Sequence, residues 1–118
     1  MALKMQRIEP AAEVSWLTPH LINQLILDTK MVLQDGRILQ RKIWQLPQVE
    51  PDRPHGFKYR LYCGQNGQTI ARYDNETGKG AHRYVGTQEL ETSYVFASLV
   101  QLLKDFAEDV ERLSGEIK

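Results

Sequence analysis

Residues 57–73, FKYRLYCGQNGQTIARY, decide the fold of this chain. The apolar side chains of the first half alternate with more polar ones, at Phe57, Tyr59, Leu61 and Cys63. A period of two is typical of a β-strand with one face on a core. The pair Asn66-Gly67 then favours a tight turn, and Thr69–Tyr73 has the composition of a returning strand. The stretch therefore predicts an antiparallel β-hairpin, with Tyr59 and Cys63 in the core.

The register of this hairpin depends on the length of its turn. A three-residue loop, Gln65–Gly67, sets Tyr59 opposite Tyr73, whereas a two-residue loop sets Leu61 opposite Arg72. The apolar alternation favours the three-residue loop, because a slip by one residue moves every side chain to the other face. That register leaves Ile70 facing outward.

Upstream, the sequence predicts a second hairpin. Asn23–Gln34 reads as a strand, Asp35-Gly36 is a two-residue hairpin signal, and Arg37–Leu46 reads as the partner strand. Pro47 then ends that strand, because proline cannot donate to the ladder. Trp44, inside this hairpin, is expected to fill the core.

A C-terminal helix is predicted over residues 98–114. Ser98 and Gln101 match a capping box, and Gly115 stands where a glycine commonly ends a helix. Apolar residues recur at helical spacing on one face: Leu99, Leu102, Leu103, Phe106, Val110 and Leu113. The sequence thus predicts an α+β fold, with a small antiparallel sheet of two β-hairpins, about four strands, covered on one face by the C-terminal helix.

The length of 118 residues fits one domain. Within it, residues 1–20 read as a loose N-terminal arm, 23–84 as the sheet and a polar loop, and 98–114 as the helix. No apolar stretch is long enough to span a bilayer, and no apolar run follows Lys4 and Arg7 as in a signal peptide. The single cysteine, Cys63, suits a reducing compartment. These features predict a cytoplasmic protein.

Zero net charge conceals an uneven distribution. Between Arg37 and Arg83 nine basic residues stand against four acidic ones, whereas from Gly86 onward three basic residues stand against seven acidic ones. A basic surface can attract a polyanion such as a nucleic acid. An ordinary solvated surface whose halves attract each other explains the same numbers equally well.

The segment 73–84, YDNETGKGAHRY, is the best candidate for a functional site. Lys79, His82 and Arg83 lie within five residues and could together bind a phosphate and stabilise charge that develops on it. Histidine is the side-chain type suited to proton transfer near neutrality, although a lone histidine is more often an ordinary hydrogen-bonded one. Asp74 and Asn75 either contact substrate or fold the turn through side-chain-to-backbone bonds.

Other site chemistries have no motif in this chain. Gly78-Lys79-Gly80 lacks the glycine spacing and the following Ser or Thr of a phosphate-binding P-loop. No cluster of His, Cys and Asp has metal-ligand spacing. The sequence therefore predicts neither a metal nor a cofactor.

Three stretches together resemble the TumE-type toxin family of type II toxin–antitoxin modules. The family has a "KYRL" strand leading to "YDNE..GKG.HRH", followed by a "F.S...LL.DF..DV" helix. This chain has KYRL at 58–61, YDNE at 73–76, GKG at 78–80 and His82-Arg83. The helix positions also match, at Phe96, Ser98, Leu102, Leu103, Asp105, Phe106, Asp109 and Val110. The resemblance covers roughly residues 23 to 113.

The resemblance implies a toxin that binds a small cognate antitoxin, and analogy with other small toxins suggests RNA cleavage. In a metal-independent ribonuclease, His82 would act as acid or base, with Lys79 and Arg83 on the phosphate. This chain has Tyr84 where the family usually has a second histidine. If catalysis needs a histidine pair, this protein is either weakened or uses Tyr84 as the second proton carrier.

Substrate would approach along basic strand residues, with tyrosines available to stack on a base. This candidate binding set is Lys58, Arg60, Arg72, Asp74 and Asn75. The basic residues equally suit a plain solvated sheet face. The alternative function is a non-enzymatic binding module, in which the loop is structural and the protein acts by sequestering a partner. Trp16, in the N-terminal arm, is a candidate contact with the antitoxin or with a second copy in a homodimer.

Overall fold

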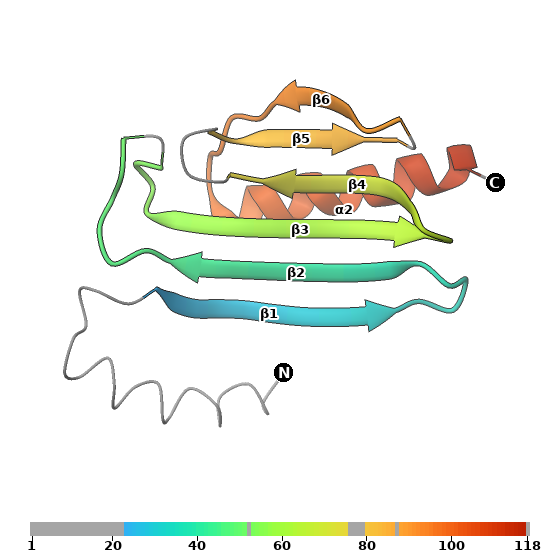
Figure 1. Ribbon diagram of the computed structural model, residues 1–118, viewed down its shortest axis with the longest axis horizontal. Coiled ribbons are helices and arrows are strands. Elements are labelled where there is room, and N and C mark those ends of the chain that lie inside the picture. Colours follow the sequence, from blue (N-terminus) through green and yellow to red (C-terminus); the bar gives the residue numbers. More distant parts are fainter. Residues whose placement is uncertain (1–22, 52, 76–79, 87, 118) are drawn as a thin grey trace.

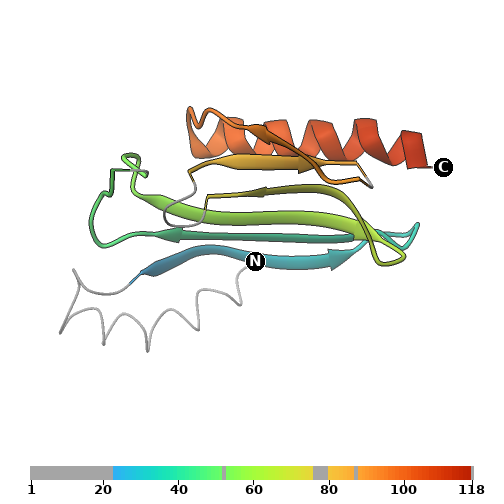
Figure 2. The ribbon, with the colours of Figure 1, turned by 45° about the horizontal axis from the view of Figure 1, so that its top comes forward.

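The described part of the chain contains six antiparallel strands and one helix. The computed structural model describes residues 23–51, 53–75, 80–86 and 88–117. The elements are β1 (Gln24–Val32), β2 (Ile38–Gln45), β3 (Phe57–Gln65), β4 (Gln68–Asp74), β5 (His82–Val85), β6 (Leu90–Ser93) and α2 (Leu99–Ile117). The strands lie in one sheet in chain order, and α2 packs behind it (Figures 1 and 2). The predicted α+β class with a C-terminal helix on one face is confirmed.

The sheet has two more strands than the predicted four. β5 and β6 form a third hairpin, beginning inside the segment that reads as a polar loop. The sequence of β5 does not show the apolar alternation of a strand. It begins with the polar residues His82 and Arg83, and Val85 is its one apolar residue that packs against the core. All four β6 residues are exposed, so hydrogen bonds to β5, rather than burial, hold this strand.

The turn between β1 and β2 is longer than predicted. Val32 still pairs with Ile38, but Leu33 donates its N–H to Arg37 O (2.8 Å), which leaves a loop of residues 34–36. Gly36 donates to Leu33 O and has a φ of +93°, a conformation that glycine adopts without a steric penalty. The Asp35-Gly36 signal therefore marks the hairpin correctly, but the two-residue loop is wrong.

The turn between β3 and β4 is shorter than predicted. Asn66 and Gly67 have φ values of +54° and +78°, as the favoured two-residue hairpin turn requires. The prediction of a three-residue loop with Tyr59 opposite Tyr73 is wrong, because Leu61 lies opposite Tyr73.

A β-bulge reconciles the two-residue turn with the apolar alternation. Cys63 pairs with Ala71 and Gly64 with Thr69, so Ile70 is an additional residue on β4. Such a bulge allows two consecutive side chains to face the same side. Ile70 and Ala71 are both fully buried, which corrects the outward position predicted for Ile70.

The core lies between α2 and the middle of the sheet. Its buried apolar side chains from the sheet are Ile43, Tyr59, Leu61, Cys63, Ile70, Ala71 and Tyr73, and those from α2 are Leu102, Phe106, Val110 and Leu113. Tyr59 and Cys63 are thus core residues, as predicted, and the apolar face of the helix is confirmed.

The predicted start of α2 is correct, and its predicted end is not. Ser98 Oγ accepts the N–H of Gln101 at 3.0 Å, as a helix cap does. The Gln101 side chain donates to Asp105 instead of completing the capping box. The helix continues through Gly115 to Ile117. A glycine inside a helix costs only about 1 kcal/mol, which contacts of the last turns with the sheet offset.

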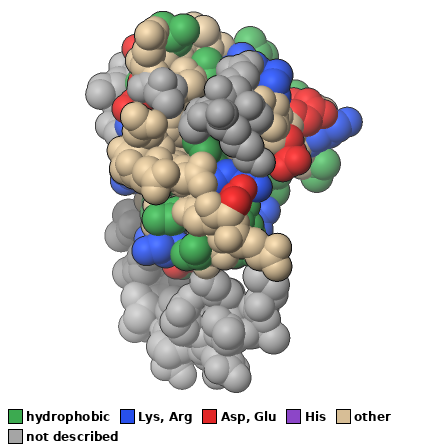
Figure 3. All heavy atoms as spheres, turned by 90° about the vertical axis from the view of Figure 1, so that its right-hand side faces the viewer, with side chains coloured by type: hydrophobic (Ala, Val, Ile, Leu, Met, Phe, Trp, Pro, Cys, Tyr) green, Lys and Arg blue, Asp and Glu red, His purple; other side chains and the backbone are tan. Residues whose placement is uncertain are grey.

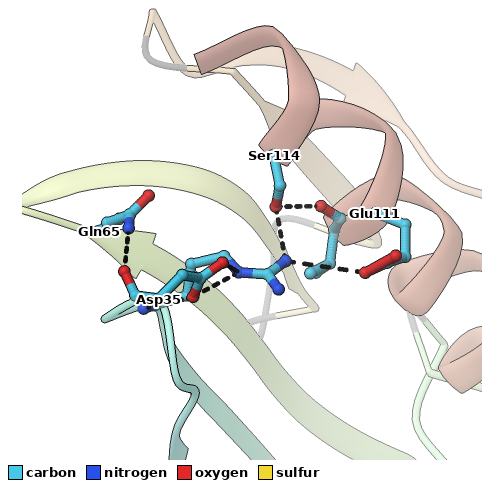
Figure 4. A network of polar contacts seen from close by, with 6 residues as sticks. Asp35, Gln65, Glu111 and Ser114 are labelled. Atoms are coloured by element: carbon cyan, nitrogen blue, oxygen red, sulfur yellow. Dashed lines mark hydrogen bonds and ion pairs between the residues drawn. The ribbon is translucent and has the colours of Figure 1, made fainter. Parts of the chain in front are cut away.

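Arg37 supplies such a contact, within a polar network in which Asp35, Gln65, Glu111 and Ser114 are labelled in Figure 4. Its guanidinium lies 2.8 Å from an Asp35 carboxylate oxygen, donates to Ser114 Oγ (2.7 Å) and lies 3.8 Å from Glu111. Gln65 Nε2 donates to the carbonyl oxygen of Asp35 at 2.5 Å. The network joins two hairpin turns to the C-terminal part of α2 and so fixes the course of the helix across the sheet.

Trp44 is not in the core, contrary to the prediction. Its neighbour Ile43 takes the core position, so the period of two turns Trp44 to the opposite side. There the ammonium groups of Lys42 and Lys58 lie 5.3 and 5.0 Å from the centroid of its ring. We call this side, which α2 does not cover, the open face. Figure 1 looks onto it, with α2 behind β3 and β4.

Residues 1–20, predicted as a loose arm containing Trp16, lie outside the described residues. Among the residues described, no helix combines the length and apolar character needed to cross a membrane.

His55 should make stability depend on pH. Its Nδ1 accepts the N–H of Phe57 (3.1 Å), and its ring stacks on Phe96 with centroids 3.9 Å apart. Burial, together with the charge of Arg53, lowers the pKa of His55 below its usual value. As pH falls below about 6.5, the unfolded chain therefore takes up the proton first, and the folded state loses stability.

We expect the wild type to lose more unfolding free energy between pH 7.5 and pH 5.5 than His55→Gln does. Urea denaturation of both proteins at the two pH values measures this difference. Equal losses in the two proteins would show that His55 is not the responsible group.

Candidate functional site

The register of β4, β5 and β6 decides which candidate residues meet. Residues directly opposite each other in antiparallel strands share a face. His82 lies between Asp74 on β4 and Ser93 on β6. Tyr84 lies between Arg72 and Glu91. All of these residues belong to the open face, as does Arg60, which pairs with Asp74.

His82 and Tyr84 lie side by side within this group. The centroids of their rings are 6.4 Å apart, and His82 Nε2 is 3.2 Å from a carboxylate oxygen of Glu91. The other ring nitrogen, Nδ1, is buried and has no hydrogen-bond partner among the described residues. Burial, followed by the nearby charge of Glu91, raises the pKa of Tyr84, so its hydroxyl stays protonated near neutral pH.

Arg72 provides the positive charge beside this pair. Its guanidinium carbon lies 4.1 Å from the centroid of the Tyr84 ring, a close cation–π contact. A nitrogen of the same group is 3.3 Å from Glu89, and the Arg72 side chain is 30% exposed. The group is therefore oriented by an aromatic ring while part of it still reaches solvent.

Arg83 is on the opposite face from His82, although the two are adjacent in sequence. It pairs with Tyr73, which belongs to the core under α2. Arg83 Nε is 3.6 Å from Asp109, and the same carboxylate accepts the Tyr73 hydroxyl at 2.6 Å. Burial and this hydrogen bond raise the pKa of Tyr73 far above its usual value. Arg83 thus joins β5 to α2, and the predicted group of His82 and Arg83 is split across the sheet.

The side chain of Asn75 is hydrogen-bonded to the backbone of β3. Its side-chain oxygen accepts the N–H of Tyr59 and its side-chain nitrogen donates to Phe57 O, both at 2.9 Å. The residue is 1% exposed. Arg53, itself buried and 2.5 Å from Glu50, contacts the carbonyl oxygen of Asn75 at 3.4 Å. Asn75 therefore fixes the end of β4.

The other predicted binding residues extend the open face toward β2. Lys58 lies beside Trp44, and Arg60 is exposed one pleat further along β3. Asp74 is only 8% exposed, whereas Tyr62 is half-buried. Lys79 lies outside the described residues. In the described part of the chain no group of three or more His, Cys, Asp and Glu side chains could hold a metal ion.

Two acidic residues at these contacts escaped sequence reasoning. Asp109 lies seven residues after Leu102, on the apolar stripe of α2, and a carboxylate in such a stripe signals a buried partner. In the structure Asp109 is only 6% exposed, and its hydrogen-bond partners are the Tyr73 hydroxyl and the Arg112 guanidinium. No pattern in the sequence pointed to Glu91, because its contact with His82 depends on the pairing of β5 with β6.

The position of Asn75 predicts a loss of stability when its amide is removed. Asn75→Ala leaves a buried N–H and a buried C=O of β3 without partners, and we expect a loss of about 2–4 kcal/mol. Chemical denaturation measures this loss, with Gln40→Ala, an exposed site on β2, as the control. Unchanged stability together with lost ligand binding would instead assign Asn75 to the ligand.

Comparison with known proteins identifies the family. A family model described as "Toxin TumE" matches residues 22–114. No curated protein and no solved structure gave a match. The matched range includes all six strands, the open face with His82, and most of α2. Because it covers well over half of the 118 residues, the chain belongs to the TumE toxin family.

Proposed function

We propose that this chain is the toxin of a two-gene toxin–antitoxin module and that it cleaves RNA without a metal ion at the open face. Membership of the TumE family implies the toxin role and a cognate antitoxin as partner. The proposal of an enzyme rests on the position of His82. This residue lies next to Tyr84 and Glu91, on a sheet face that also carries basic and aromatic side chains.

RNA cleavage of this kind needs a base for the 2′-hydroxyl, an acid for the leaving oxygen and a cation for the phosphate. His82 would exchange the proton, and Glu91 would orient its ring through Nε2. Tyr84, with its raised pKa, suits a hydrogen-bond or proton donor better than a base. Arg72 would take the phosphate contact, because it shares the open face with His82 and lies directly opposite Tyr84.

Lys79 and Arg83 have different roles in this proposal, and the roles rest on different grounds. Lys79, outside the described residues, keeps the phosphate role on the grounds of sequence alone. Arg83 contacts Asp109 under α2, so we assign it a positioning role: it would hold β5, and with it His82, against the helix.

Substrate binding would use the rest of the open face. Trp44 between Lys42 and Lys58 joins a stacking surface to positive charge, as does Tyr84 under Arg72. Single-stranded nucleic acids bind such surfaces through base stacking and phosphate contacts. Arg60, with Tyr62 half-buried beside it on β3, lies between these two pairs, so a short RNA segment could cross β2 to β5.

One observation favours a second candidate, a non-enzymatic binding module. Arg72 and His82 already contact acidic residues, Glu89 and Glu91. On this alternative these pairs stabilise the β5–β6 hairpin, and the open face sequesters an anionic partner without chemistry.

The two candidates differ in what His82→Ala does. We expect the wild type to arrest growth and degrade RNA after induction, and His82→Ala to lose at least about a hundredfold of the cleavage rate while its thermal midpoint is nearly unchanged. Growth, total RNA and circular dichroism are measured for both, with His55→Gln as a control histidine. Growth arrest with intact RNA in both wild type and His82→Ala would favour the binding module.

A matched pair of arginines tests the binding face. Arg72 and Arg41 both lie on strands, but Arg41 pairs with Leu61 on the helix side and donates to Thr29 Oγ1. Arg72→Ala should weaken binding of a single-stranded oligoribonucleotide by about tenfold and lower its salt dependence by roughly one phosphate contact, and Arg41→Ala should do neither. Fluorescence anisotropy over a salt series measures both effects. Equal effects of the two substitutions would contradict binding at the open face.

A further inference from the structure

The two edges of the sheet are unlike each other. β6 is four residues long, and short edge strands limit pairing with other chains. β1 is nine residues long and pairs only with β2 among the described elements. Because Leu33 directs its N–H to Arg37 on the β2 side, alternation turns the backbone groups of Val32, Lys30 and Asp28 toward the outer edge of β1, where no described strand pairs with them.

Exposed apolar side chains gather at this edge. Of the nine large hydrophobic residues that are exposed in the described part, five belong to β1 and the start of β2: Leu25, Ile26, Met31, Val32 and Ile38. Val32 reaches 69% exposure. Viewed from the end where the β1–β2 turn lies, hydrophobic side chains reach the lower described surface (Figure 3). An edge that is long and apolar provides a template for another strand.

The charges on β1 indicate which strand fits there. β1 reads Leu27-Asp28-Thr29-Lys30-Met31, with one acid and one base placed symmetrically about Thr29. If a second β1 runs antiparallel with Thr29 opposite Thr29, then Asp28 faces Lys30 of the other copy twice and Leu27 faces Met31 twice. Opposite charges directly across antiparallel strands are favourable. Centring the pair on Asp28 or Lys30 instead brings like charges together.

From this self-complementary pattern we propose that the protein forms a homodimer through β1, with Thr29 at the two-fold axis. Two six-stranded sheets then continue into one of twelve strands. The axis is perpendicular to the sheet, because only such an axis pairs two copies of one edge antiparallel. Both open faces therefore lie on the same side of the joined sheet.

Charge reversal tests this register. Asp28→Lys alone and Lys30→Asp alone each place like charges opposite each other twice, and each should raise the dimer dissociation constant by about tenfold or more. The double variant Asp28→Lys/Lys30→Asp should dimerise like the wild type. Mixing the two single variants should also restore dimers, since every Lys then faces an Asp of the other chain.

Analytical ultracentrifugation of the full chain measures these states against the monomer mass of 13.6 kDa. Thr29→Cys adds a direct check of the axis, because paired residues about 4.5–5.5 Å apart at Cα allow a disulfide. Oxidation should cross-link Thr29→Cys but not Lys30→Cys, and the native Cys63 is buried. A wild type that is monomeric up to high micromolar concentration, as expected if this edge serves the antitoxin instead, overturns the proposal. So does a dimer that neither single variant weakens.

Discussion

The alternation of side chains along β4 and β5 is the constraint on which the rest of the molecule depends. In a strand, consecutive residues point to opposite faces, so adjacent polar residues cannot act at one place. His82 and Tyr84 face away from the helix, and Arg83 between them faces Asp109. The sheet thus separates two tasks within three consecutive residues. One face holds the fold together, and the other presents the proposed site.

On the helix side, a polar cluster inside an apolar core helps to hold the fold together. Tyr73 and Asp109 are both buried, and their hydrogen bond of 2.6 Å satisfies groups that would otherwise destabilise the core. Arg83 completes the connection from β5 to α2. Nearer the C-terminal end of the helix, Arg37 makes the corresponding link to the β1–β2 turn. The strand that carries His82 is therefore held by the same contacts that hold the helix.

Local patterns in the sequence predict the framework well. The alternation of 57–63, the Asn66-Gly67 turn and the apolar stripe of α2 each depend on a few neighbouring residues, and the corresponding elements are confirmed. The errors share one physical cause. The bulge at Ile70, the outward Trp44 and the β5–β6 hairpin depend on which strand lies beside which, and periodicity within one strand does not contain that information. For the same reason the sequence groups Arg83 with His82, whereas the strand register brings Arg72 to it.

The central claim is that ligand binds the open face while the helix face stays structural. Solution NMR of the isotope-labelled His82→Ala protein, titrated with a short single-stranded oligoribonucleotide, tests it directly without cleavage of the ligand. The account predicts large shifts for the Trp44 indole, the Tyr84 ring and the Arg72 guanidinium, with the Arg83 guanidinium and the Tyr73 ring nearly unchanged. Shifts concentrated at Arg83, Tyr73 and the helix, with the Trp44 indole unmoved, would contradict it.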